Sequence, residues 1–314
     1  MTALHIETPL LRAPPELFDP DGGDRTVWLK MDALQPSGSF KMRGVCHLVQ
    51  RRVAEGARAV VCASGGNAGV AATLAARALG VPATIVVPQT TAASVREAIA
   101  ARGAKLIVHG AAWDDAHAHA TALAREQGAV YVHPFDDPLL WEGHASLIDE
   151  TVRAGASFDV VVTCVGGGGL VAGIVEGLRR NGLSRVPVIA VETEGAASFA
   201  AALAAGECVT LPAITSIATS LGARRVMPHL LDLAREHEIL SVVVSDAQAV
   251  AACSRFADTM RVLVEPACGA ALAALDARPD LFARFEAPLV EVCGGMGVTP
   301  AKLAQWKTQL GLDG

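Results

Sequence analysis

The stretch Val160-Val161-Val162-Thr163-Cys164-Val165-Gly166-Gly167-Gly168-Gly169 decides the fold class, because an apolar run ends in four glycines and a helix-period segment starts at Leu170. A short apolar run of this kind is typical of a buried strand in a parallel sheet. Four glycines forfeit backbone entropy, so a close approach or an unusual φ angle must require them. Free amides at a helix N-terminus suit an anion such as a phosphate. We therefore expect a strand–loop–helix unit that binds an anion.

The same alternation of short apolar runs and helix-period segments extends over almost the whole chain. Expected strands are Val27–Lys30, Ala59–Ala63, Ala83–Val87, Lys105–Val108, Ala129–Val132, Val160–Val165, Val188–Glu192, Ser241–Val244 and Leu289–Cys293. Expected helices include Ala68–Leu79, Ala92–Arg102, Ala111–Gln127, Leu170–Arg180, Asp246–Asp258 and Pro300–Leu310. This pattern predicts an α/β fold with mostly parallel sheets flanked by helices.

The alternation is interrupted once, by His133-Pro134-Phe135-Asp136-Asp137-Pro138. It is regular from about Val45 to Val132 and resumes at Phe158. We expect a small α/β domain at residues 45–135, inserted in a larger domain made of residues 1–44 and 136–314.

Composition limits the classes of function. The 314 residues carry a net charge of −6 without a block of like charges, which argues against a nucleic-acid surface. No apolar run reaches membrane length, and the N-terminus lacks the regions of a signal peptide. The seven cysteines are scattered and form no C-x-x-C pair, which indicates a reducing compartment rather than a zinc site or disulfide framework. We expect a cytoplasmic protein whose partners are small molecules or a second copy of the chain.

One lysine stands at the end of the small, hydroxyl-rich turn Pro36-Ser37-Gly38-Ser39-Phe40-Lys41. A lysine amine with a lowered pKa forms a Schiff base with a carbonyl compound. Pyridoxal phosphate needs such a lysine, an anion cradle and a partner for its ring nitrogen. A surface lysine in a polar loop is the alternative, and this turn alone leaves the two interpretations equally open.

A second turn of interest is Ser64-Gly65-Gly66-Asn67, between an expected strand and an expected helix. Its backbone amides and the Ser64 hydroxyl suit a carboxylate, and Asn67 can donate to a ring oxygen. An ordinary strand-to-helix turn with Ser or Asn as N-cap explains the same residues.

A competing interpretation of the four glycines is a dinucleotide site. Gly167-x-Gly169-x-x-Ala172 matches the relaxed fingerprint, and Glu192 lies at about the distance expected for a ribose-binding acid. An NAD-dependent oxidoreductase would leave Lys41 and the Ser64–Asn67 turn without a role. It also predicts no absorbance in the Schiff-base band at about 410–420 nm.

Cys293 follows an expected buried strand and precedes two glycines. A buried cysteine is usually part of the core. Facing a pyridine nitrogen, a thiol with a pKa of about 8.5 is too weak an acid to keep that nitrogen protonated. A neutral ring is a poorer electron sink, which favours loss of a β-leaving group over reprotonation of the α-carbon.

Taken together, these segments resemble the fold-type II (tryptophan synthase β-like) pyridoxal phosphate enzymes, and within them the L-serine/L-threonine dehydratase family, closest to its animal-type L-serine dehydratases. The resemblance covers nearly the whole chain and includes four further stretches: Lys30-Met31-Asp32, Val81–Pro88, Pro134–Pro138 with Trp141-Glu142-Gly143-His144, and Val264–Ala271.

The resemblance implies roles for individual residues. Lys41 and Ser64 are the expected catalytic residues: Lys41 forms the Schiff base and removes the substrate α-proton, and Ser64, Gly65 and Gly66 hold the substrate carboxylate. The remaining residues expected to contact the cofactor are Phe40 on the ring face, Asn67 at the ring hydroxyl, Gly166, Gly167, Gly168, Gly169 and Leu170 at the phosphate, and Cys293 at the ring nitrogen.

The resemblance also implies a monovalent cation, K⁺, held largely by backbone carbonyls. Its expected ligands are Gly166, Glu192, Ala196, Leu221 and Ala223. For Glu192 two other interpretations remain, the ribose-binding acid and a surface carboxylate.

Three departures from the pattern of the family concern four residues. Met296 and Gly297 stand where Ser and Asn are expected, Ser220 replaces an alanine against the cofactor ring, and Gly65 replaces the alanine of the most active animal type. We expect the reaction to survive and its rate and serine-to-threonine preference to change.

We therefore expect a catabolic enzyme that deaminates L-serine, and L-threonine as second substrate, to a 2-oxo acid and ammonia. The chain leaves no room for a C-terminal regulatory domain, and a homodimer is typical of the family. Racemisation of serine and β-replacement by a thiol are alternatives within the same fold. A sensor without catalysis would have no need of Lys41.

Overall fold

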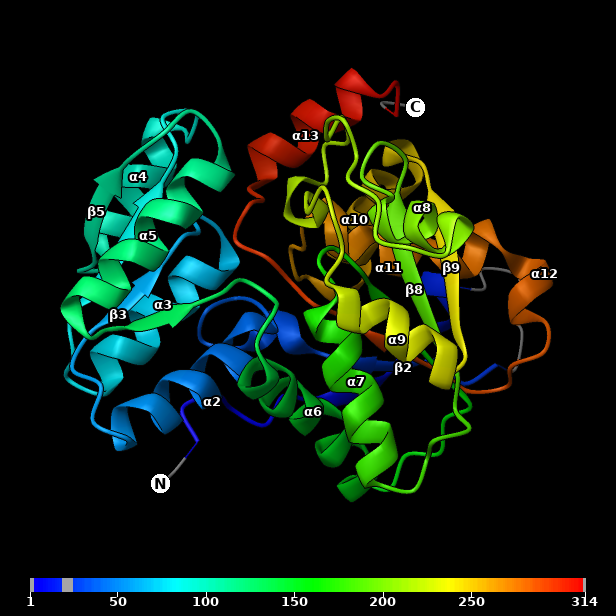
Figure 1. The fold of residues 1–314 in the computed structure, drawn as a ribbon. Helices are drawn as coiled ribbons and strands as arrows, with labels where there is room; N and C mark the ends of the chain where they lie inside the picture. The colour runs from blue at the N-terminus through cyan, green and yellow to red at the C-terminus, as the bar shows by residue number, and fades with distance from the viewer. Residues whose placement is uncertain (1–2, 19–24, 313–314) are drawn as a thin grey trace. The chain divides into compact units, whose positions relative to one another are not determined.

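The computed structural model describes residues 3–18 and 25–312 as an α/β protein in two units (Figure 1). The first unit comprises Met1–Ile6 and Gln35–His144, and the second comprises Glu7–Leu34 and Ala145–Gly314. Among the helices of the described residues, none has both the length and the apolar character that a membrane span requires. The expected fold class is confirmed.

The first unit contains a parallel sheet in the order β5-β4-β3-β6. Its strands are β3 (Val60–Cys62), β4 (Ala83–Val87), β5 (Lys105–Val108) and β6 (Val130–Val132). The helices are α2 (Lys41–Ala54), α3 (Asn67–Ala78), α4 (Ala93–Ala101) and α5 (Trp113–Gln127).

Alternation along the strands explains how both faces of this sheet are buried. Val60 and Cys62 of β3 belong to the core under α2 and α3, whereas Val61 and Ala63 point to the opposite face. There they pack with the α5 alanines Ala116, Ala120 and Ala124, which recur every fourth residue and so share one side of the helix.

The second unit contains a six-stranded sheet in the order β1-β2-β10-β7-β8-β9. Its strands are β1 (Leu10–Arg12), β2 (Trp28–Lys30), β7 (Val160–Cys164), β8 (Val188–Thr193), β9 (Ile239–Val244) and β10 (Pro288–Glu291). Only the β1–β2 pair is antiparallel. Every residue of β7 and β8 is buried, as a parallel strand covered on both faces requires.

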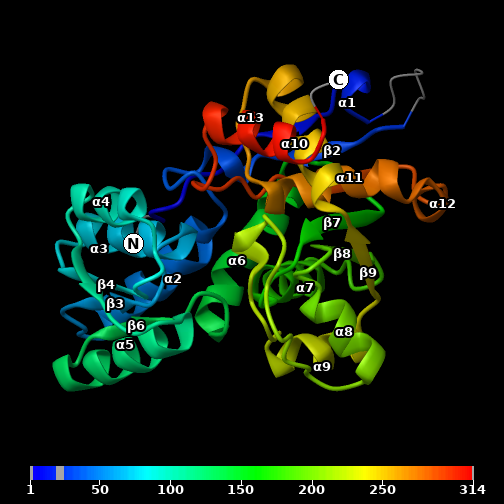
Figure 2. The ribbon, with the colours of Figure 1, turned by 90° about the horizontal axis from the view of Figure 1, so that it is seen from above.

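Helices cover both faces of this sheet (Figure 2). On one side lie α7 (Gly169–Arg180), α8 (Ser198–Ala205) and α9 (Pro228–Glu236), and on the other lie α10 (Asp246–Met260) and α11 (Pro266–Ala277). The shorter peripheral elements are α1 (Pro15–Phe18), η1 (Asp32–Leu34), η2 (Thr219–Leu221), α12 (Pro279–Phe282) and α13 (Pro300–Gln309).

The expected strands and helices are confirmed to within two residues at each end. The three-residue strand β1 was not anticipated, because its side chains are mostly exposed and it is too short to show an alternating pattern.

The division of the chain differs from the expected bounds of 45–135 for the small domain, since residues 35–44 and 136–144 belong to the first unit. The reason is helix packing: Gly44 of α2 lies against α6 (Pro138–Arg153), and a Cβ there would be 2.5 Å from the Leu140 carbonyl oxygen.

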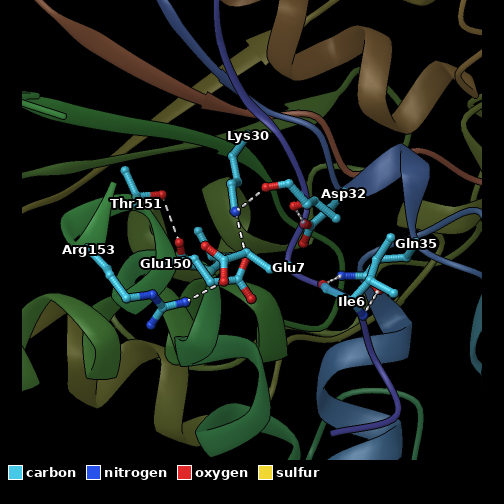
Figure 3. Close-up of polar contacts among 10 residues, drawn as sticks. Ile6, Glu7, Lys30, Asp32, Gln35, Glu150, Thr151 and Arg153 are labelled. Atoms are coloured by element: carbon cyan, nitrogen blue, oxygen red, sulfur yellow. Dashed lines mark hydrogen bonds and ion pairs between the residues drawn. The ribbon is translucent and has the colours of Figure 1, made fainter. Parts of the chain in front are cut away.

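A buried ion pair in the second unit joins β2 to α6 (Figure 3). Lys30 Nζ lies 2.6 Å from Glu150 Oε2 and donates to the Thr8 carbonyl at 2.8 Å. The Thr8 hydroxyl in turn donates to Asp32 Oδ1 at 2.8 Å. Because Lys30 is 1% exposed, this network is enclosed, and the Lys30-Met31-Asp32 stretch has a structural role.

Candidate active site

Lys41 is the first residue of α2, and its amine lies near the carboxyl ends of β3 and β6. Lys41 Nζ donates to the Pro134 carbonyl at 2.6 Å, two residues beyond β6, and lies 4.7 Å from the Phe40 ring centroid. Burial raises the pKa of Cys62, the last residue of β3, to about 12, and the charge of Lys41 acts in the opposite direction. This edge of a parallel sheet is where α/β proteins bind ligands.

The turn before Lys41 has, at Gly38, a backbone conformation that favours glycine. Gly38 has a φ of +73°, in the left-handed region, and its amide donates to the Gln35 carbonyl at 2.7 Å. The Ser39 hydroxyl is fully buried and has no hydrogen-bond partner within the described chain. An unpaired buried hydroxyl two residues from Lys41 is a polar group that a ligand can satisfy.

The Ser64–Asn67 turn joins β3 to α3, as expected. Its helix is capped by Gly66 without any side-chain hydrogen bond, so Ser64 and Asn67 do not act as the N-cap. Ser64 Oγ accepts from the Gly66 amide at 3.3 Å. A Cβ on Gly69 would lie 1.8 Å from the Ser64 carbonyl oxygen, so only glycine lets the strand approach the helix this closely. The start of α3 suits a carboxylate, because the first amides of an α-helix have no intrahelical acceptor.

The four glycines join β7 to α7 in the second unit, and Gly166 and Gly168 have close neighbours where a side chain would begin. Gly168 is the N-cap, with a φ of +107°, and a Cβ there would lie 2.9 Å from Leu230 Cδ2. A Cβ on Gly166 would lie 3.3 Å from the Leu221 Cα. The Gly167 carbonyl accepts from the Met227 amide at 3.0 Å.

These contacts hold the glycine loop in place, and none of them uses the first backbone amides of α7. The first amides of an α-helix have no intrahelical acceptor, and α7 has no side-chain cap to replace one. Together with the helix dipole, they favour an anionic group of phosphate size.

Cys293 follows β10, the parallel neighbour of β7, and is surrounded by thiols. Its Sγ lies 3.6 Å from Cys164 Sγ. Hydrogen bonding to Cys164 and Cys268, and then burial, raise the pKa of Cys293 well above its ordinary value. Cys293 is therefore a neutral thiol, as a partner for an unprotonated pyridine nitrogen has to be.

The loop after Cys293 is held by Glu265, a contact that the sequence did not indicate. Gly295 has a φ of +128°, and a Cβ there would lie 2.0 Å from Glu265 Cδ. Glu265 Oε2 accepts from the Gly297 amide at 3.1 Å. At this departure from the family pattern, the backbone itself therefore supplies a hydrogen bond.

Glu192 is fully buried, so the interpretation as a surface carboxylate is wrong. Its oxygens accept from the Phe199 and Ala200 amides, at 2.7 and 2.8 Å, which places the carboxylate at the start of α8. Burial raises the pKa of Glu192 to about 7, and the two hydrogen bonds act in the opposite direction.

The structure brings together only some of the residues that are expected to bind the cation. Gly166 and Leu221 are in contact, and the Leu221 carbonyl accepts from the Ala223 amide at 2.8 Å. Ala196 is buried beyond the end of β8. The cation site stays a prediction.

Two histidines of the first unit were not anticipated as neighbours of Lys41. His144 is fully buried, its ring centroid is 5.1 Å from that of Phe40, and neither ring nitrogen has a hydrogen-bond partner within the described chain. Burial, and then the charge of Lys41, lower the pKa of His144 well below its ordinary value. His133 appeared only as part of an interruption in the strand–helix pattern, although it precedes the carbonyl that Lys41 contacts.

The groups that pyridoxal phosphate requires are all present, distributed over the two units. The first unit carries the lysine amine, an aromatic ring beside it and the start of α3. The second carries the anion cradle of Gly166–Gly169 and the thiol of Cys293. Within its own unit, each group has the chemistry that the cofactor requires of it.

Comparisons with known proteins identify the family. The family model described as pyridoxal-phosphate dependent enzyme matches residues 1–294. The chain is 48% identical over 322 residues to the L-serine dehydratase/L-threonine deaminase of Mus musculus, covering 99% of this chain and 98% of the relative.

Solved structures agree with that assignment. A fungal L-serine ammonia-lyase from Rhizomucor miehei superposes with a TM-score of 0.90 at 36% identity, covering 98% of this chain and 100% of the other. Maize serine racemase superposes with a TM-score of 0.85 at 25% identity, covering 97% and 92%. The chain therefore belongs to the fold-type II family of pyridoxal-phosphate dependent enzymes.

Proposed function

We propose that the protein is an L-serine ammonia-lyase that also accepts L-threonine and forms pyruvate or 2-oxobutanoate with ammonia. The observation that carries the proposal is the buried thiol of Cys293, whose Sγ lies 3.6 Å from Cys164 Sγ. A neutral thiol leaves the pyridine nitrogen unprotonated, so the α-carbanion is poorly stabilised and loses its β-hydroxyl. The names of the relatives support the same reaction.

The residues take the following roles in this proposal. When bound, pyridoxal phosphate supplies the electron sink that makes the substrate α-proton removable. Lys41 Nζ attaches the cofactor and takes the α-proton. Ser64 and the amides of Gly65 and Gly66 orient the substrate carboxylate, and the amides of Gly166–Leu170 hold the phosphate.

A second candidate is serine racemase activity, and Ser220 is the observation that favours it. Its side chain is exposed on η2, where the family pattern expects an alanine, and a hydroxyl can donate a proton to the α-carbon from the opposite face. The likeness to maize serine racemase makes this reaction a direct competitor.

Product analysis distinguishes the two. Purified protein with pyridoxal phosphate is incubated with L-serine, pyruvate is followed by a coupled lactate dehydrogenase assay, and D-serine by chiral chromatography. We expect pyruvate in large excess, none of it with Lys41→Ala, and less D-serine with Ser220→Ala. A mixture dominated by D-serine contradicts the lyase proposal.

We further propose a K⁺ ion at Gly166, Glu192, Ala196, Leu221 and Ala223, a homodimer and a cytoplasmic location. The buried carboxylate at the end of β8 supports the ion, because a bound cation would keep Glu192 ionised where burial opposes it. Replacing K⁺ by tetramethylammonium should lower the activity of the wild type.

Light scattering tests the proposed homodimer, and the distribution of the native protein between cell fractions tests the proposed cytoplasmic location.

A further inference from the structure

The segment after β6 carries the carbonyl that contacts Lys41. Pro134 O accepts from Lys41 Nζ at 2.6 Å, although 93 positions separate the two residues in the sequence. A distance this short is typical of hydrogen bonds in which one group is charged. The position of this carbonyl therefore helps to determine where the Lys41 amine lies.

The His133 ring fixes the turn that contains Pro134. Its Nδ1 accepts from the Phe135 amide at 3.2 Å and from the Asp136 amide at 2.7 Å. A ring nitrogen that accepts carries no proton, so the imidazole is neutral and its proton is on Nε2. Burial lowers the pKa of His133 to about 4, with His117 and Lys41 acting in the same direction, so the ring remains an acceptor at neutral pH.

Four aromatic rings lie edge-on to the His133 ring. The centroid distances from His133 are 4.6 Å to Phe135, 5.5 Å to His117, 6.2 Å to Trp113 and 6.3 Å to Tyr131, with interplanar angles of 84°, 88°, 90° and 71°. Trp113 also donates from its indole nitrogen to the Ala63 carbonyl at 2.7 Å, next to Ser64. The same cluster thus supports the Pro134 turn and the end of β3.

We propose that His133 is a positioning residue for Lys41: it holds the Pro134 carbonyl in place, and that carbonyl orients the lysine amine for removal of the substrate α-proton. The inference rests on the proposed role of Lys41. Without the ring acceptor, the turn loses both hydrogen bonds and the carbonyl shifts. A displacement of about 1 Å of a reacting group lowers a rate by roughly 100-fold.

The test compares His133→Ala with His133→Asn in the holoenzyme. An asparagine amide oxygen accepts from backbone amides two and three residues ahead, so it can replace Nδ1, whereas alanine cannot. Tyr131→Phe is the matched control, because it removes a hydroxyl from the same cluster (Tyr131 Oη lies 2.5 Å from His117 Nδ1) without touching the turn. The readouts are kcat and KM for L-serine, the kinetic isotope effect with α-deuterated L-serine, and the cofactor absorbance.

In His133→Ala we expect kcat to fall about tenfold or more, with KM and cofactor absorbance unchanged. The isotope effect should rise, because proton removal becomes slower than the other steps. His133→Asn should recover most of kcat and the wild-type isotope effect, and Tyr131→Phe should match the wild type. Wild-type kcat in His133→Ala, a fall in kcat without a larger isotope effect, or no recovery in His133→Asn overturns the inference.

A measurement on the unmodified protein covers the case in which the variants do not fold. In ¹⁵N-histidine-labelled holoenzyme at pH 7, the His133 ring should show the neutral Nε2–H tautomer. A proton on Nδ1 overturns the inference, because that nitrogen could then not accept the two amides. The proposed function fails separately, if the wild type binds the cofactor and forms no 2-oxo acid.

Discussion

Replacing Gly168 by alanine tests the phosphate cradle, and Gly182 provides the matched control. Both glycines border α7 and have positive φ angles, +107° for Gly168 and +74° for Gly182. A Cβ on Gly182 would meet nothing within 4 Å, whereas one on Gly168 would lie 2.9 Å from Leu230 Cδ2 and 3.1 Å from its Cβ. Comparing Gly168→Ala with Gly182→Ala therefore separates the effect of backbone strain from the effect of steric overlap at the phosphate cradle.

The expected magnitudes follow from these contacts. A non-glycine residue in the left-handed region costs roughly 1–2 kcal/mol, which applies to both variants. Overpacking against the buried Leu230 adds about 1–3 kcal/mol in Gly168→Ala. A loop that shifts to relieve this overlap loses at least one charged hydrogen bond to the phosphate, about 1.5–3 kcal/mol, which corresponds to a Kd for pyridoxal phosphate at least tenfold higher.

The assay has two parts. Urea unfolding of the apoprotein gives the stability, and titration of the apoprotein with pyridoxal phosphate gives the Kd. We expect Gly182→Ala to lose about 1 kcal/mol of stability and to keep the wild-type Kd. Gly168→Ala with wild-type affinity for the cofactor would refute the assignment of these glycines to the phosphate.

Three further predictions concern stability, rate and pH. Lys30→Met should destabilise the protein by about 3–5 kcal/mol in urea unfolding, because it removes the cation 2.6 Å from the buried Glu150 carboxylate, whereas Arg153→Ala, which breaks an exposed pair with Glu7, should cost less than about 1 kcal/mol; similar losses would contradict the enclosed network. Gly65→Ala should keep the fold, because its Cβ would be 3.2 Å from Val87 Cγ1 and needs only a small shift, and should raise kcat for L-serine, since the family pattern has alanine here; a lower kcat argues against our interpretation of this position. The pKa of Glu192 is raised to about 7 in the folded state, so its protonated form contributes stability that is fully present below about pH 4.5 and is lost as the pH rises through 7. Without K⁺, the free energy of unfolding of the wild type should therefore fall by about 2 kcal/mol more than that of Glu192→Gln between pH 5.5 and 8. Parallel curves of stability against pH would exclude the shift.

The fold could be predicted because its signals are local. Alternation of buried side chains along β3, the alanine stripe on α5 and the mostly apolar strand β7 each follow from neighbouring residues. The bounds of the two units could not be predicted in this way. They depend on the contact of Gly44 with Leu140, nearly a hundred residues along the chain.

The candidate site likewise has parts that neighbouring residues predict and parts that depend on contacts between distant residues. The glycine loop was predictable, because four consecutive glycines are themselves a local signal of an unusual φ angle or a close approach; Gly168 has the first, and Gly166 lies close to Leu221. The neutral state of Cys293 was expected from its chemistry, and the structure adds its thiol neighbours. The roles of His133 and Glu265 depend on contacts that only the folded chain makes.

The most direct test of the account is the site of covalent attachment of the cofactor. Purified protein with pyridoxal phosphate should absorb at about 410–420 nm, and borohydride should bleach the band. Peptide mass spectrometry of the reduced protein should then find the phosphopyridoxyl group on Lys41. An adduct on another lysine such as Lys105 or Lys302, or a colourless protein, contradicts the central claim.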